Sequence, residues 1–166
     1  MTRTKFWLPL VLVAACLGIY ANGLHGDFLF DDAYNITRNT FIRDFHNIPK
    51  LFTRDYFSLA QEGAYRPVPT AVLFADHALF GYSVEGYRIV NILWHALATL
   101  LIFWLLVKWL SPLLGAARAR SVSFLAALLF AVHPIHSQMI GVISFHEDLI
   151  CFVLMLSCLH LYLRDK

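Results

Sequence analysis

Long apolar runs separated by short charged segments constrain this chain more than any other feature of its sequence. The first run extends from Phe6 to Leu24 without a charge, and a second extends from Ile89 to Leu110 with Lys108 as its one charged residue. Charged residues make up 14% of the chain, against about 25% in a soluble domain. Each run is about as long as a bilayer-crossing helix. The sequence therefore predicts an all-α membrane protein.

We expect about four transmembrane helices, at residues 6–24, 89–110, 121–143 and 147–163, in one polytopic domain covering residues 1–166. The segment Ser111–Arg120 is interpreted as a short basic turn. The third helix either includes part of that turn or kinks at Pro134, whose ring interrupts helical hydrogen bonding. The alternative for the first run is a cleaved signal peptide, with a lipoprotein-like box at residues 13–16.

The distribution of charge predicts the orientation of these helices. The two termini and the 108–120 turn together carry seven basic residues and one acidic residue, whereas residues 25–88 and 133–148 carry six basic and ten acidic ones. Short basic loops mark the cytoplasmic side, so we expect both termini in the cytoplasm. The membrane would be a bacterial inner membrane or the endoplasmic reticulum.

The predicted outer loop, residues 25–88, is the one sizeable segment between spans. Its apolar-rich stretches at 41–57 and 68–80 carry aromatic residues among charges. Amphipathic helices lying in the membrane interface have this composition, and so does a small folded domain on top of the bundle. The fold class we expect is four membrane helices with a large extracytoplasmic first loop that carries amphipathic helices.

Two acidic residues, Asp31 and Asp32, follow the first span by several residues, in the run Phe28-Leu29-Phe30-Asp31-Asp32. Adjacent side chains do not share a helix face. One carboxylate is therefore expected to point to what lies above the bundle, while its neighbour anchors the loop or binds a cation. A carboxylate near a water-excluded pocket suits a general base. The alternative is a solvated acidic turn.

Further polar groups are predicted on the same side of the membrane. Arg66, between Tyr65 and Pro67, presents a planar cation that suits a phosphate or carboxylate. Asn91 and His95, four residues apart, share one helical face. They either face a cavity or join helices through hydrogen bonds.

A histidine-rich segment completes this outer group, and its polar residues are His133, His136, Gln138, His146, Glu147 and Asp148. The spacing matches no standard zinc signature, so we assign no metal ligand. The sequence identifies no cofactor, and a divalent cation at this face is left open. The acidic pair Glu147 and Asp148 also suits a helix N-terminus.

Several strings of this chain resemble the transmembrane and tetratricopeptide-repeat O-mannosyltransferase family. They are Phe28–Asp32, Tyr65-Arg66-Pro67, Gly86–His95, and His133-Pro134-Ile135-His136 followed by Asp148. The family is of the GT-C class of polytopic glycosyltransferases, which take sugar from a polyprenyl-phosphate-linked donor. The resemblance implies that the chain is an N-terminal portion of a larger GT-C fold.

The resemblance also implies roles for residues. Asp31 or Asp32 would be the catalytic base for an acceptor hydroxyl, and Arg66, His133 and His136 would lie near the donor phosphate. Tyr65, Asn91, His95, Gln138, His146, Glu147 and Asp148 would support the site. The implied partners are the lipid-linked donor, a protein or glycan acceptor and the bilayer, with no nucleic acid.

The chain departs from the family pattern at three places. Arg88 stands where a histidine is common, Gln138 where a glutamate is usual, and Phe145-His146-Glu147-Asp148 where Gly-Arg-x-Asp is usual. These departures leave a second hypothesis open, a non-catalytic membrane scaffold or assembly subunit that retains the GT-C fold. A third hypothesis, a piece of a transporter or channel, requires charges deep within spans, and none lies mid-span.

Overall fold

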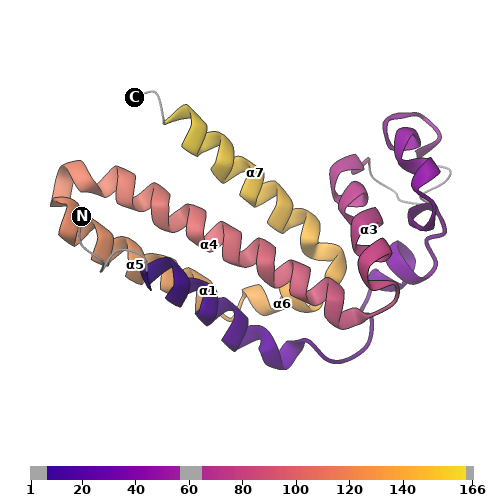
Figure 1. The fold of residues 1–166 in the computed structure, drawn as a ribbon, viewed down its shortest axis with the longest axis horizontal. Coiled ribbons are helices and arrows are strands. Elements are labelled where there is room, and N and C mark those ends of the chain that lie inside the picture. The colour runs from indigo at the N-terminus through magenta and orange to yellow at the C-terminus, as the bar shows by residue number, and fades with distance from the viewer. Residues whose placement is uncertain (1–6, 57–64, 164–166) are drawn as a thin grey trace.

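The computed structural model describes residues 7–56 and 65–163, and these residues form helices and connecting turns without a strand (Figure 1). Four helices form an elongated bundle: α1 (Trp7–Tyr20), α4 (Val84–Leu114), α5 (Ala116–Val132) and α7 (His146–Tyr162). Helix α4 packs against the other three. The predicted all-α class is therefore confirmed for the described residues.

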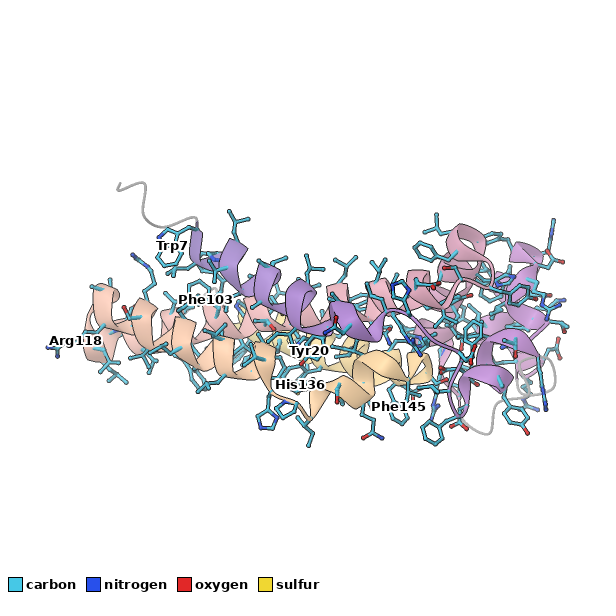
Figure 2. All side chains as sticks on the ribbon, turned by 90° about the horizontal axis from the view of Figure 1, so that it is seen from below. Trp7, Tyr20, Phe103, Arg118, His136 and Phe145 are labelled. Carbon is cyan, nitrogen blue, oxygen red and sulfur yellow. The ribbon has the colours of Figure 1, made fainter. Side chains whose placement is uncertain are left out.

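The start of α1, the α4–α5 turn and the end of α7 lie toward the end of the bundle away from α3 (Figure 1). The rings of Trp7 and Phe124 lie 6.1 Å apart, and Lys108 Nζ donates to the carbonyl of Leu163. Arg118 projects from this end, and polar atoms gather at the opposite end (Figure 2). The orientation in a bilayer stays a prediction, and residues 1–6 and 164–166, whose charges it uses, lie outside the described residues.

Two helical segments of the described chain are long and apolar enough to cross a membrane, Val84–Leu114 and Ile143–Tyr162. A shorter apolar helix covers Trp7–Gly23, in which α1 continues into the 3-10 turn η2 (Ala21–Gly23). The number of four spans stays a prediction.

The predicted basic turn at Ser111–Arg120 is wrong. Helix α4 continues to Leu114, and α5 begins at Ala116. Gly115 alone reverses the chain with φ 76°, a conformation that glycine adopts without the clash of a Cβ atom. One glycine therefore replaces the longer turn, and Arg118 and Arg120 become helical.

The third predicted span is interrupted at His133-Pro134. His133 ends α5 in an extended conformation with ψ 126°, which is favoured because the ring of the following proline disfavours helical geometry at the residue before it. A short helix α6 (His136–Gly141) and the 3-10 turn η6 (Ile143–Phe145) then lead into α7. Both alternatives hold in part, since α5 includes five residues of the predicted turn and the helix breaks at the proline.

The predicted outer loop contains short helices and a core of its own. The π-helix η3 (Ala33–Thr37), the 3-10 helices η4 (Phe41–Arg43) and η5 (Phe45–Phe52), and α3 (Pro67–Phe80) pack together beside the start of α4. The buried residues of this core are Ile36, Phe41, Ile42, Leu51, Tyr56, Leu73, Phe74, Val84, Tyr87 and Ile143. This packing favours the small folded unit over helices lying flat in the interface.

Candidate functional site

The two carboxylates of the acid pair have different surroundings. Asp32 is fully buried, and its carboxylate accepts four hydrogen bonds. The donors are the amides of Leu29 (3.0 Å), Ile143 (3.2 Å) and Ser144 (2.8 Å) and the hydroxyl of Ser144 (2.7 Å). Asp31 is exposed. The structure thus divides the pair into one anchoring and one accessible carboxylate.

The backbone at Phe30 produces this division. Phe30 has φ 48°, in the left-handed region that residues with a side chain rarely adopt. The turn closes with the amide of Asp32 donating to the carbonyl of Leu29, and the π-helix η3 follows. Strained residues and π-helical turns concentrate at functional sites in proteins. The local geometry therefore supports a functional role for the acid pair.

Ser144 connects the acid pair to the start of α7. Asn35 Nδ2 donates to Ser144 Oγ over 3.0 Å, and this hydroxyl donates in turn to Asp32. His146 is buried, with Nδ1 2.9 Å from the carbonyl of Ile143 and Nε2 3.2 Å from the carbonyl of Pro69. Residues 143–146 therefore tie the acid pair to α3. Our sequence reasoning missed Ser144 and assigned Asn35 no role in the site.

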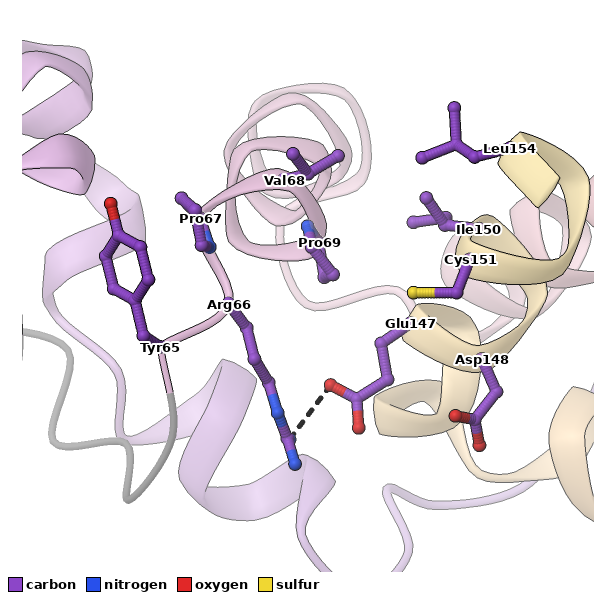
Figure 3. A pocket seen from close by; sticks show the side chains of 10 residues that line it. All are labelled: Tyr65, Arg66, Pro67, Val68, Pro69, Glu147, Asp148, Ile150, Cys151 and Leu154. Atoms are coloured by element: carbon purple, nitrogen blue, oxygen red, sulfur yellow. Dashed lines mark ion pairs between the residues drawn. The ribbon is translucent and has the colours of Figure 1, made fainter. Parts of the chain in front are cut away.

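A cavity of about 480 Å³ lies between the start of α3 and the start of α7 (Figure 3). Its polar side carries Arg66, Glu147 and Asp148, and Arg66 Nη1 lies 2.9 Å from Glu147 Oε2. Its apolar side includes Val68, Pro69, Ile150, Cys151 and Leu154. A cavity with an arginine at one side and apolar walls along a candidate span suits an anionic group on a hydrocarbon chain.

A second cavity, of about 370 Å³, shares Asp148 with the first. It is lined by His136, Phe130 and other apolar side chains. The ring of His136 is half-buried, with its centroid 4.4 Å from that of Phe130 and 4.8 Å from that of His95. His133 is exposed and lines neither cavity. Of the two histidines predicted near the donor phosphate, His136 therefore lines a cavity and His133 does not.

The polar face of α4 binds backbone carbonyls. Asn91 Nδ2 donates to Met139 O over 3.1 Å, and His95 Nε2 lies 3.1 Å from Ala131 O. Both residues are buried. Of the two roles that the sequence left open, these contacts support the joining of helices.

Arg88, on the same face of α4, is the residue that our sequence reasoning most undervalued. It is buried, and its guanidinium donates five hydrogen bonds to backbone carbonyls. The acceptors are Gly141, Gly23, Leu24, His25 and Asp27, at 2.8 to 3.3 Å. Arg88 therefore joins the segment before the acid pair to α4 and to the end of α6. The sequence feature that could have identified Arg88 is a permanent charge at the start of an apolar run.

The remaining predicted residues lie at the surface. Gln138 and Tyr65 are exposed, and the Tyr65 ring lies 5.3 Å from that of Tyr56. Within residues 7–56 and 65–163, no three His, Cys, Asp or Glu side chains are grouped as a metal site requires.

The chain is similar to protein O-mannosyl-transferases over most of its length. It is 32% identical over 162 residues to one from Caenorhabditis elegans, an alignment that covers 95% of this chain and 23% of the relative. It is 30% identical to human protein O-mannosyl-transferase TMTC4 (88% and 21%) and 32% identical to mouse TMTC2 (89% and 18%). The predicted resemblance to the transmembrane and tetratricopeptide-repeat O-mannosyltransferases is therefore confirmed.

The chain spans about a fifth of the length of these relatives. No family model matches it. No solved structure matches it either.

Proposed function

We propose that this chain carries donor-binding and acceptor-activating residues of a GT-C type glycosyltransferase. The enzyme would transfer a sugar from a polyprenyl-phosphate-linked donor to a protein or glycan hydroxyl at the outer face of the membrane, the periplasm or the lumen. The names of the relatives favour mannose as the sugar. The observation that carries the proposal is the division of the acid pair, with Asp32 fixed on Ser144 and Asp31 exposed.

In this proposal Asp31 is the catalytic base. A base needs a free oxygen within hydrogen-bond reach of the acceptor hydroxyl. The four donors around Asp32 occupy its oxygens, so Asp32 is a positioning residue that holds the turn. The exposed carboxylate of Asp31 is accessible to an acceptor.

The donor would bind in the cavity between α3 and α7. Its phosphate would lie on Arg66, in competition with the Glu147 carboxylate, and its polyprenyl chain would lie along Ile150 and Leu154. Arg66 is 46% exposed, so an incoming anion can reach it. A cation at the leaving phosphate stabilises the charge that develops there during transfer. His136, in the adjoining cavity, would lie close to the same phosphate.

Substitution of the acid pair tests the catalytic role. In the full-length protein, Asp31→Asn should lower sugar transfer in membranes by about 10²–10⁴-fold, the usual contribution of a general base. Folding and membrane insertion should stay normal. Asp27→Asn, a matched change at an exposed residue, should transfer sugar at the wild-type rate. Wild-type transfer by Asp31→Asn would overturn the proposed base.

Cysteine labelling tests the donor cavity independently. Cys151 lines the cavity and is exposed, whereas Cys16 is buried. In a Cys158→Ser background, we expect a polyprenyl phosphate to slow the reaction of Cys151 with a maleimide. An uncharged polyprenol should protect less, because it lacks the anion that Arg66 binds. Equal protection by both compounds, or none by either, would contradict this donor site.

A further inference from the structure

Asp76 is a buried carboxylate without a partner in the described part of the chain. It lies in α3, and 7% of its surface is exposed. No hydrogen bond or ion pair from residues 7–56 or 65–163 reaches its carboxylate. A buried charge without a partner is costly, and proteins usually pair such a group. The donor cavity and the acid pair do not account for a buried carboxylate without a partner at Asp76.

The carboxylate lines a cavity of about 340 Å³ between α3 and the first turns of α4. The other lining residues are Val72, Val90, Leu93, Trp94 and Leu97, so Asp76 is the one charged group among them. Helix α3 lies beside the start of α4 in Figure 1. Leu93 and Leu97 are exposed on the surface of a helix long enough to cross a membrane.

This lining restricts the chemistry of a ligand. Divalent cations such as Ca²⁺ take six to eight oxygen ligands, and this cavity offers one carboxylate. A phosphate or carboxylate ligand would be repelled, in contrast to the donor cavity with Arg66. A single ammonium group fits, because a carboxylate accepts its hydrogen bonds and the face of an indole attracts it.

We propose that the cavity between α3 and α4 binds an amphiphile that carries one ammonium group. The ammonium lies on Asp76 beside the ring of Trp94. The hydrocarbon chain lies on Leu93 and Leu97, along the exposed surface of α4 beside the cavity. The site is separate from the cavity of Arg66 and Glu147, since the two cavities share no lining residue.

Thermal unfolding of the chain in dodecyl maltoside micelles at pH 7.5 tests this site. The probe is decylammonium, and decanol is the uncharged ligand of equal chain length. A ligand that binds the folded state raises the unfolding temperature by mass action. We expect decylammonium to raise it in a saturable manner and decanol to leave it unchanged.

Substitutions test whether the carboxylate of Asp76 binds the ammonium group of the probe. Asp76→Asn should weaken the response to decylammonium roughly tenfold or more, because a charge-assisted hydrogen bond is lost. Asp27→Asn, the same change at an exposed residue, should respond like the wild type. Leu93→Trp, which narrows the cavity and keeps the carboxylate, should also weaken binding and serves as a second variant if Asp76→Asn does not fold. An equal response of Asp76→Asn or Leu93→Trp and the wild type, or of decanol and decylammonium, would overturn the proposal.

Discussion

The hydroxyl of Ser144 donates to the carboxylate of Asp32 over 2.7 Å, across 112 residues of sequence. The amides of Ile143 and Ser144 donate to the same carboxylate. This contact fixes the segment after the first helix on the segment before α7. The accessible Asp31 and the cavity of Arg66 and Glu147 therefore belong to one connected unit, whose parts come from three regions of the chain.

Asp32→Ala should destabilise the protein, whereas Asp31→Ala should not. Removal of the Asp32 carboxylate leaves the buried amides of Ile143 and Ser144 unpaired, and an unpaired buried donor costs about 1–3 kcal/mol. Asp31 is exposed, so its removal should change the unfolding free energy by less than about 0.5 kcal/mol. Denaturation of both variants in the same detergent measures the difference. Equal stability of the two variants would show that Asp32 is not an anchor.

Arg88→Lys should loosen the segment that leads to the acid pair. A lysine keeps the charge but offers three donors from one atom, so it cannot reach carbonyls at Gly23, Asp27 and Gly141 together. We expect faster proteolysis within residues 23–27 and a loss of stability on the order of 3 kcal/mol. Arg118→Lys, at an exposed position of α5, is the matched control and should behave like the wild type. Unchanged proteolysis of Arg88→Lys would contradict the assigned role.

The sequence predicted those features that depend on local pattern. The predicted apolar spans at 6–24, 89–110 and 147–163 correspond to helices α1, α4 and α7 within five residues at each end, because apolar composition and length are properties of adjacent residues. The break before Pro134 follows from the geometry of the preceding residue. The division of Asp31 and Asp32 was also expected, because neighbouring side chains diverge.

The features that sequence reasoning missed depend on contacts between distant segments. The acceptors of Arg88 are backbone carbonyls 53 to 65 residues away. Every residue has a backbone carbonyl, so the sequence does not indicate which carbonyls accept these hydrogen bonds. Asp76 lies in a stretch whose apolar residues suggested an interfacial helix. Its isolation becomes visible only when α3 packs on α4. Whether Asp31, Arg66 and His136 act in catalysis stays a prediction.

Asp76 should make the stability of the protein depend on pH. Burial raises the pKa of its carboxyl group from 3.8 to about 6. The folded state thus binds the proton more tightly than the unfolded state, and the unfolding free energy contributed by this group falls as the pH rises from about 4 to about 6. The change is on the order of 2–3 kcal/mol at most.

Asp76→Asn removes this titration and keeps the shape of the side chain. We therefore expect the variant to be more stable than the wild type at pH 7.5, and the difference to shrink at pH 4.5. Unfolding at both pH values measures this, without added amphiphile. All other titratable groups remain in both proteins, so their contributions cancel in the comparison. A variant less stable than the wild type at pH 7.5 would mean that the carboxylate has a favourable partner.

Gly86→Ala should disturb the packing of α3 on α4, and Gly18→Ala should not. A Cβ atom at Gly86 would overlap the ring of Phe80, whereas a Cβ atom at Gly18 meets no atom within 4 Å. Both glycines lie in helices, where alanine is otherwise favoured by up to about 1 kcal/mol. We expect Gly18→Ala to stabilise the protein and Gly86→Ala to destabilise it by about 1–3 kcal/mol through overpacking. Because the overlapping atoms belong to the Phe80 side chain, including its Cβ atom, Gly86→Ala should cost less in a Phe80→Gly background, and a double-mutant cycle measures this coupling. Additive effects of the two substitutions would show that the close approach at Gly86 does not limit the fold.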